Sequence, residues 1–404
     1  MRPTETQARA EDVARAAYGK LLATLASRDG DIMAAEDAHS DAFVAALRTW
    51  PERGIPDNPE AWLLAVARNR RIDRARKDQR LTFTDDVPDM IDTPSPDRDP
   101  ALDDRLKLLF VCAHPAIDPA LHTPLMLQTV LGLEAEEIAR AFLVSPTAMA
   151  QRLVRAKRKI KAARVPFRLP EEEDYPERMG AVLEAIYGAF AVDWLDGPGA
   201  LTHEAFFLST ILAKLAPEIP EALGLTALIG FVEARRDARV QNGILVPVPE
   251  QDTTLWDHRL IVLSHRQLKQ ASTFREIGRF QLEAAIQSVH AARATTGRTD
   301  WHALSQLYAG LMGTFPTIGA AVSHAAVVAE EAGPAHGLDM LGRISAEDIE
   351  RYQPAHAVRA HCLAKLGRFA EAAEAYTTAI ELSSDDPSRR WLEARVADLR
   401  KRAS

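Results

Sequence analysis

With 404 residues, 47% of them hydrophobic, the chain is long enough for two to three packed domains. Its only cysteines, Cys112 and Cys362, lie far apart in the sequence, which excludes a disulfide framework and a cysteine zinc site. The N-terminus lacks the apolar core of a signal peptide, and the longest nearly apolar run, Leu223 to Val232, is too short to span a membrane. We therefore expect a soluble, cytoplasmic protein.

The net charge of −8 is distributed unevenly along the chain. Residues 1–168 carry 26 basic and 25 acidic side chains, whereas residues 169–404 carry 23 basic and 32 acidic ones. The first part gathers its positive charge into two runs, so its local field can be strongly positive although its balance is only +1. These two runs are the first candidates for contacts with a nucleic acid.

Two amphipathic helices are predicted at the start of the chain. Glu11 to Ser27 places Val13, Ala17, Leu21 and Leu25 on one stripe. A second helix is predicted from Ile32 to Trp50, with Pro51 ending it. Its inward residues are Ala35, Ala38, Ala42, Phe43, Ala46 and Leu47, and its outward residues are Glu36, Asp37 and Asp41.

A third predicted helix carries the first basic run. It begins at Asn58 or Pro59 and continues to Arg80, with Trp62, Leu63, Val66 and Ile72 facing inward. Its basic face consists of Arg68, Arg70, Arg71, Arg74, Arg76, Lys77 and Arg80. By itself this face indicates either a phosphate-contacting surface or a solvated helix.

The next stretch, Thr82 to Pro100, has no periodicity, four prolines, and six aspartates against one arginine. This composition predicts an extended, flexible acidic linker. A second compact helical unit is predicted from Leu102 to Pro170, and it contains the second basic run.

Within that unit, Glu134 to Lys161 predicts a helix-turn-helix. Ile138, Ala141 and Phe142 fall at helical spacing, and Met149, Leu153, Ala156 and Ile160 resume the period after a break. Ser145 is the expected N-cap of the second helix, with Pro146 at its first position. The expected outer face carries Gln151, Arg152, Arg155, Lys157, Arg158, Lys159, Lys161 and Arg164. A solvated basic helix is the alternative, but the capped turn favours a helix that reads DNA in the major groove.

The remainder of the chain, from Glu171 onward, is predicted to be helical throughout. His356 to Leu382 has the character of a tetratricopeptide hairpin, with small and large residues at Ala360, Gly367, Phe369, Ala372, Tyr376 and Ala379. Only this copy is clear. The fold class predicted for the whole chain is therefore all-α.

No pattern indicates catalysis. The twelve histidines show no pair at convincing ligand spacing with a carboxylate, and there is no phosphate-cradling glycine loop or nucleophile elbow. We expect no catalytic residue, no bound metal, no cofactor and no enzymatic activity.

Two long segments resemble the bacterial extracytoplasmic-function (ECF) sigma factors. The segment GDIMAAEDAHSDAFVAALRTWPERGIPDNPEAWLLAVARNRRIDRARK resembles sigma region 2, and EEIARAFLVSPTAMAQRLVRAKRKIK, with LFVCAHPAIDP before it, resembles region 4. Downstream segments such as GILVPVPEQDTTLWDHRLI and LGRFAEAAEAYTTAIEL look like the C-terminal tetratricopeptide-like extension of one branch. The resemblance implies region 2 at 1–81, the linker at 82–101, region 4 at 102–168 and the extension at 169–404.

The resemblance also implies roles for particular residues. The family binds the core RNA polymerase at the β′ clamp helices and the β flap, and the matching residues here are Asp37, Asp41, Phe43 and Leu47. For Phe43, a place in the ordinary core is an equal alternative. The positions that match −10 element contacts are Arg68, Asn69, Arg70, Arg71 and Arg74. Those that match −35 element contacts are Thr147, Ala150, Gln151, Arg152, Arg155 and Arg158.

A second class of function is a helix-turn-helix regulator or scaffold that binds a protein partner through its helical repeats and has no role with core polymerase. The region 2 segment favours the sigma factor, because a simple regulator needs no such segment. The charge split adds one hypothesis: the acidic extension folds back on a basic face and competes with DNA for it.

Overall fold

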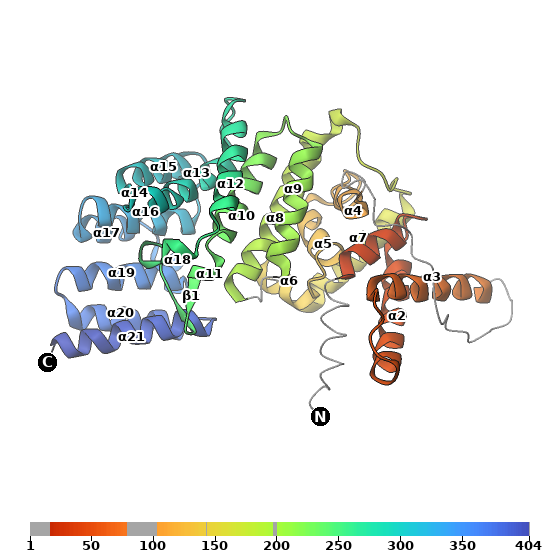
Figure 1. Ribbon diagram of the computed structural model, residues 1–404, viewed down its shortest axis with the longest axis horizontal. Coiled ribbons are helices and arrows are strands. Elements are labelled where there is room, and N and C mark those ends of the chain that lie inside the picture. Colours follow the sequence, from red (N-terminus) through yellow and green to blue (C-terminus); the bar gives the residue numbers. More distant parts are fainter. Residues whose placement is uncertain (1–16, 79–102, 143, 197–199, 404) are drawn as a thin grey trace. The chain divides into compact units, whose positions relative to one another are not determined.

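Helices form nearly all of the described residues, 17–78, 103–142, 144–196 and 200–403, in the computed structural model (Figure 1). This confirms the predicted all-α class. The chain divides into two compact units: unit 1 is Met1–Asp193 with Gly199–Leu212, and unit 2 is Trp194–Pro198 with Ala213–Ser404. The predicted linker at 82–101 lies outside the described residues.

Unit 1 begins with three helices: one described over residues 17–26, then α2 (Ile32–Arg53) and α3 (Pro59–Asp78). The Asp31 side chain caps α2 by accepting from the Ala34 N–H at 3.1 Å. The expected end at Pro51 is wrong, because the helix continues to Arg53 and ends at Gly54, which has φ 84°. A proline in the last turn removes only one backbone hydrogen bond, and the Gly54 N–H still reaches the Trp50 carbonyl at 2.9 Å.

Small residues let α2 and α3 pack closely. Along α2 the buried positions are Ile32, Ala35, Ala38, His39, Ala42, Ala46 and Trp50. Trp50 meets Trp62 of α3 edge to face, with ring centroids 5.5 Å apart. Leu63 and Val66 are buried as expected, but Ile72 is 44% exposed, which corrects its predicted inward position.

The rest of unit 1 is a second group of helices. They are α4 (Asp104–Cys112), η2 (Pro119–Leu121), α5 (His122–Thr129), α6 (Ala135–Ala141), α7 (Pro146–Ala162), η3 (Glu172–Asp174), α8 (Tyr175–Asp196) and most of α9 (Ala200–Leu215). Phe110 of α4 stacks on Tyr175 at the start of α8, with centroids 5.5 Å apart. The first helix packs tightly on this group, since a Cβ at Gly19 would lie 1.9 Å from the Val130 carbonyl oxygen.

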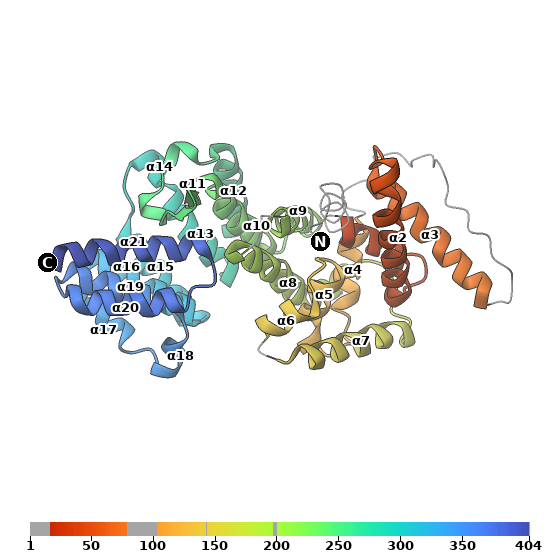
Figure 2. The ribbon, with the colours of Figure 1, turned by 90° about the horizontal axis from the view of Figure 1, so that it is seen from below.

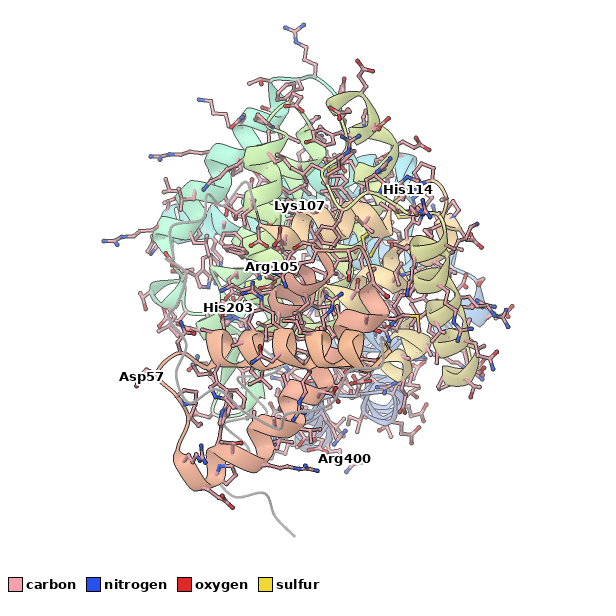
Figure 3. All side chains as sticks on the ribbon, turned by 90° about the vertical axis from the view of Figure 1, so that its right-hand side faces the viewer. Asp57, Arg105, Lys107, His114, His203 and Arg400 are labelled. Carbon is pink, nitrogen blue, oxygen red and sulfur yellow. The ribbon has the colours of Figure 1, made fainter. Side chains whose placement is uncertain are left out.

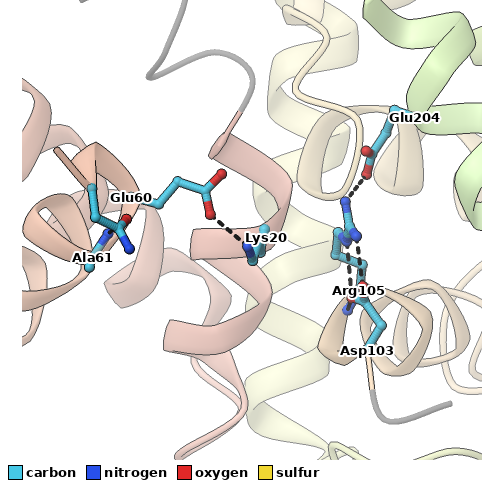
Figure 4. Close-up of polar contacts among 7 residues, drawn as sticks. Lys20, Glu60, Ala61, Asp103, Arg105 and Glu204 are labelled. Atoms are coloured by element: carbon cyan, nitrogen blue, oxygen red, sulfur yellow. Dashed lines mark hydrogen bonds and ion pairs between the residues drawn. The ribbon is translucent and has the colours of Figure 1, made fainter. Parts of the chain in front are cut away.

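Arg105 of α4 ties two helices of unit 1 together (Figure 4). Its guanidinium bonds Asp103, the N-cap of α4, through Nη2 at 2.6 Å and Nε at 3.0 Å, and pairs with Glu204 of α9 through Nη1. It also lies 4.6 Å from the centroid of the Phe207 ring. Figure 3 labels Arg105 and its neighbour Lys107 among the side chains of the molecule.

Unit 2 is a succession of helices, each packed mainly on its neighbours in the chain (Figure 2). They are α10 (Pro220–Glu233), α11 (Arg236–Arg239), η4 (Val248–Glu250), η5 (Thr253–Leu255), α12 (His258–Ser272), α13 (Arg279–Ala291), α14 (Arg293–Thr296), α15 (Trp301–Thr314), α16 (Ile318–Glu331), α17 (Pro334–Leu341), α18 (Ala346–Glu350), α19 (Gln353–Lys365), α20 (Phe369–Glu381) and α21 (Asp386–Ala403).

A short hairpin interrupts this succession. Strands β1 (Val240–Gln241) and β2 (Ile244–Leu245) pair antiparallel around Asn242 and Gly243, whose φ values are 54° and 75°. An Asn-Gly pair is the usual residue choice for a two-residue turn with both φ values positive. The prediction of helices throughout the chain from Glu171 onward is therefore wrong at this hairpin.

The hairpin predicted at His356 to Leu382 is present as α19 and α20, joined at Gly367, which has φ 76°. Ala360, Ala372, Tyr376 and Ala379 are all buried in one cluster with residues of α21. The two helices are thus confirmed, whereas their tetratricopeptide character stays a prediction.

Candidate nucleic-acid interface

Helix α7 has one buried face and one exposed basic face. The Ser145 side chain caps it by accepting from the Ala148 N–H at 3.3 Å, and Pro146 occupies its first turn, as predicted. Met149, Leu153, Ala156 and Ile160 are buried at helical spacing. The opposite face holds most of the residues predicted to read the −35 element: Thr147, Gln151, Arg152, Arg155 and Arg158 are exposed, and Ala150 is half-buried. The structure therefore brings these six positions together on one accessible surface.

Helix α6 and a short turn hold α7 in place. Glu134 and Glu137 form a capping box at the start of α6, with the Glu137 carboxylate accepting from the Glu134 N–H at 2.8 Å. At the other end, the Val144 N–H reaches the Ala139 carbonyl at 3.0 Å. The capping box thus fixes the start of α6, and a backbone hydrogen bond joins its last turn to the residue before the Ser145 cap.

Lys157 is a correction to the predicted outer face of α7. Its side chain is buried, with 6% of the residue exposed, and its ammonium bonds both oxygens of Glu36 in α2 at 2.6 and 2.7 Å. Lys161 pairs with Asp31 at 2.6 Å, one turn further along. Lys157 follows the buried Ala156, and its long stem carries the charge across to α2, so helical spacing alone misplaced it.

Burial and the two lysines shift the pKa values of Glu36 and Asp31 in opposite directions. Desolvation raises the pKa of Glu36 above its ordinary value, although the positive charge and hydrogen bonds of Lys157 act to lower it. At Asp31 desolvation is outweighed by the hydrogen bonds from Lys161 and the Ala34 N–H, and the pKa is lowered. The two ion pairs join α7 to the start of α2.

Replacing Lys157 by methionine is expected to destabilise unit 1 by about 1–3 kcal/mol, because the Glu36 carboxylate stays largely buried and loses a charged hydrogen-bond partner. Urea unfolding followed by circular dichroism measures this difference. Lys159→Met, which changes an exposed lysine on the same helix, is the control and should fall within about 0.5 kcal/mol of wild type. Equal effects of the two variants would contradict the importance of the Glu36 contact.

The basic run on α3 is only partly a free surface. Arg68, Asn69 and Arg70 are half-buried, and the side chain of Arg74 lies outside the described residues. Arg71 is engaged within the unit: its Nη1 donates to the Leu25 carbonyl at 2.5 Å, and its Nη2 pairs with Asp29. Arg71 thus links α3 to the end of the first helix, and its contact with DNA stays a prediction.

Along α2, the residues predicted to bind core polymerase follow one side of the helix. Asp37 is exposed, and Asp41, Phe43 and Leu47 are half-buried. Sequence reasoning missed Val44, which is 47% exposed and lies one and two turns from Asp41 and Asp37. An apolar residue in register with two aspartates was the signal that could have identified it.

The described residues were also compared with the requirements of a metal site and of a membrane-spanning helix. Among the described residues, no group of three or more histidine, cysteine or acidic side chains could hold a metal ion. The described helices include none long and apolar enough to cross a membrane. Both cysteines are buried and free.

Comparisons with known proteins identify two parts of the chain. Residues 8–81 match sigma-70 region 2, and residues 178–272 match a family of unknown function, DUF6596. An uncharacterized protein of Rhizobium meliloti (strain 1021) is 36% identical over 368 residues, which cover 87% of this chain and 86% of that protein. No solved structure matches. A sigma-70 region 2 suggests a role in transcription initiation and implies a non-enzymatic transcription factor that binds core RNA polymerase.

Proposed function

We propose that this chain, which belongs to the same protein family as that Rhizobium meliloti protein, is an RNA polymerase sigma factor of the ECF type. The observation that carries the proposal is the sigma-70 region 2 match over residues 8–81, which contains α2 and α3. The exposed basic face of α7, in the same unit, supports a second DNA contact. The activity would be promoter-specific initiation, with polymerisation left to the core enzyme.

Helix α2 is the proposed contact with the clamp helices of β′. It offers the carboxylates of Asp37 and Asp41 and, one turn after Asp41, the exposed apolar side chain of Val44. Such a surface suits a partner groove lined by basic side chains, where charge orients the encounter and apolar burial holds it. Phe43 and Leu47, both half-buried and one turn apart on the adjoining side of α2, would extend this surface with apolar contacts.

Helix α3 is the proposed contact with the −10 element. Capture of an unstacked base needs polar groups on the base edge and cations near the phosphates. Asn69 supplies the amide, and its neighbours Arg68 and Arg70 supply the cations. Arg71 would contribute by holding α3 against Leu25 and Asp29, and Arg74 would extend the basic run.

Helices α6 and α7 form the proposed helix-turn-helix for the −35 element, and the β flap is the expected polymerase contact of this region. Gln151 can bond adenine through two hydrogen bonds, and Arg152 or Arg155 can bond guanine in the same way. Thr147, Ala150 and Arg158 complete the surface. Lys157 and Lys161 take no part in it here, because they pair with α2.

The C-terminal helices are proposed as a tetratricopeptide-like extension that binds a protein regulator or the polymerase itself. The α19–α20 hairpin supports this, with small alanines at the helix interface and a glycine in the turn. To test whether the extension inhibits or assists, the chain should be shortened after Leu212 rather than after Arg168. Cutting at Arg168 would remove α8 and uncover Phe110, which stacks on Tyr175.

Run-off transcription with purified bacterial core polymerase and a promoter library tests the proposal. We expect new start sites that share a two-part upstream motif. If the full chain is inactive and the version shortened after Leu212 is active, the extension is inhibitory. If neither form binds core enzyme or starts transcripts, the sigma factor is excluded and the DNA-binding regulator or scaffold becomes the better interpretation.

Arg155→Glu is expected to weaken promoter binding by the holoenzyme by roughly 10–100-fold, because one base contact contributes about 1–3 kcal/mol. Fluorescence anisotropy on labelled promoter fragments gives the affinity. Lys269→Glu makes the same charge change at an exposed site on α12 of unit 2 and should leave binding near the wild-type value. The loss at Arg155 should shrink when the −35 bases are scrambled. An equal loss on both fragments would show that Arg155 contacts phosphate and no base, and no loss on either fragment would show that it does not contact the DNA.

A further inference from the structure

Unit 2 contains a buried arginine with no acidic partner. Arg235, which follows α10, is 3% exposed, and its guanidinium donates through Nη2 to the Gln287 side-chain oxygen of α13 at 2.5 Å. Its Nη1 has no hydrogen-bond partner, and no described carboxylate is among the groups that act on it electrostatically. Burial, together with the charge of Arg293, lowers the pKa of Arg235 to about 10. The group still carries its charge at neutral pH.

A second guanidinium lies against the same tryptophan. The Cζ atoms of Arg235 and Arg293 are 5.9 and 5.1 Å from the centroid of the Trp256 ring, and Trp256 is itself buried. Arg293 is half-buried, and its Nη2 donates to the carbonyls of Val248 and Gln251 at 3.1 and 2.5 Å. The acid that acts on Arg293 electrostatically is the exposed Asp252, outside ion-pairing distance and already bonded to Thr254.

His290 belongs to the same cluster. Burial and the charges of Arg235 and Arg293 lower its pKa to about 3, so the imidazole is neutral at physiological pH. Its Nδ1 has no partner, and the same holds for the Arg293 Nε and the Trp256 Nε1. Counting the Arg235 Nη1, four nitrogen atoms of these four side chains are therefore buried without a hydrogen-bond partner.

Such a cluster destabilises the folded protein unless an acceptor forms hydrogen bonds with its unpartnered groups. Withdrawing charged and polar groups from water is unfavourable when no partner replaces the lost hydration, and cation–π contact with one ring offsets only part of this. Buried polar groups in folded proteins are almost always hydrogen-bonded. The missing partner must be negative, because two cations are present, and it must accept several hydrogen bonds.

We propose that this cluster is a binding site for a small oxyanion, a phosphate or carboxylate group held by Arg235 and Arg293 beside Trp256. Guanidinium groups match the geometry of both anions and bond them through two N–H groups at once. Arg293 is partly accessible and would admit the ligand, while Arg235 would bind it from the buried side. The site lies in the C-terminal helices, so it gives the protein a means of sensing a small anionic molecule. It does not depend on the proposed sigma activity.

The test is a thermal unfolding series on the full chain in sodium phosphate, sodium acetate or sodium chloride at matched ionic strength. A specific site should raise the midpoint by about 5 °C in the preferred oxyanion at a concentration roughly 100 times its Kd, relative to chloride. Phosphate and acetate distinguish the two sources of the anion. Isothermal titration with the better anion should give one site per chain.

Arg293→Gln should abolish this shift, whereas Arg298→Gln, an exposed arginine five residues later, should keep it. Arg293 is preferred to the buried Arg235 because its replacement leaves the packing of α10 intact. Phosphate bound by the basic face of α7 would persist in Arg293→Gln and be lost in Arg155→Glu. The proposal is overturned if the three salts give equal midpoints, or if Arg293→Gln responds like Arg298→Gln.

Discussion

Arg105→Met is expected to destabilise unit 1 by about 3–5 kcal/mol, one of the two largest effects predicted for a single substitution in this chain. Arg105 is 8% exposed and bonds two carboxylates, Asp103 and Glu204. Removing the guanidinium leaves both acids largely buried without a counter-ion. The loss also weakens the N-terminus of α4, because Arg105 holds the capping side chain of Asp103 in place.

The pKa values of the two acids are shifted in opposite directions. At Asp103, burial is outweighed by the hydrogen bonds and charge of Arg105, and the pKa is lowered. At Glu204, burial dominates and the pKa is raised in spite of Arg105. Asp103 therefore contributes stability above its unfolded pKa, which is lost as the pH falls through the lowered folded pKa. Glu204 opposes it, since a raised folded pKa makes its ionisation at neutral pH unfavourable.

Urea unfolding at pH 7, followed by circular dichroism, measures the effect of Arg105→Met. Arg140→Met replaces an exposed arginine on α6 and should change the free energy of unfolding by less than about 0.5 kcal/mol. A loss below about 1 kcal/mol for Arg105→Met would mean that the desolvation of the three charges cancels their attraction. In that case the contact between α4 and α9 would rest on apolar packing alone.

Trp50→Ala is the second substitution with a large expected effect, and it should lower the free energy of unfolding by about 3–5 kcal/mol. Trp50 is 1% exposed, at the end of α2, and packs on Trp62 of α3. The alanine variant leaves a cavity between the two helices, and the contact proposed for core polymerase lies on one of them. Binding of core polymerase by the alanine variant should therefore decrease in proportion to the fraction of unfolded protein.

Trp50→Phe is the matched variant. The indole Nε1 of Trp50 is buried without a hydrogen-bond partner, so phenylalanine keeps much of the ring contact and removes an unsatisfied N–H. We expect a cost below about 1.5 kcal/mol for this change. Thermal or urea unfolding of the two variants side by side gives the comparison. If both lose the same stability, the indole N–H has a partner in solution, and ring volume is not the main contribution.

The sequence by itself determined the local structure. Helical spacing of apolar residues placed α7 and its buried face correctly, since burial of one stripe is a property of the helix and needs no knowledge of its partner. Ser145 and Pro146 gave the start of that helix for the same reason: a cap and a proline satisfy or omit backbone donors within one turn. The exposed positions from Thr147 to Arg158 followed directly. The region 2 segment was recognised from the pattern of residues across α2 and α3, which its family match confirms.

Only the tertiary structure decided which charged side chains are engaged. Lys157 and Glu36 are 121 residues apart, and Arg105 and Glu204 are 99 apart, so no local period relates them. A lysine or arginine on a helix looks the same in the sequence whether its flexible side chain reaches solvent or a buried acid. The same holds for Arg235 and Arg293, because only the folded chain shows that these two cations are withdrawn from solvent without an acidic partner. Periodicity fixes the direction of a Cβ atom, but the packing of distant segments fixes where a long side chain ends.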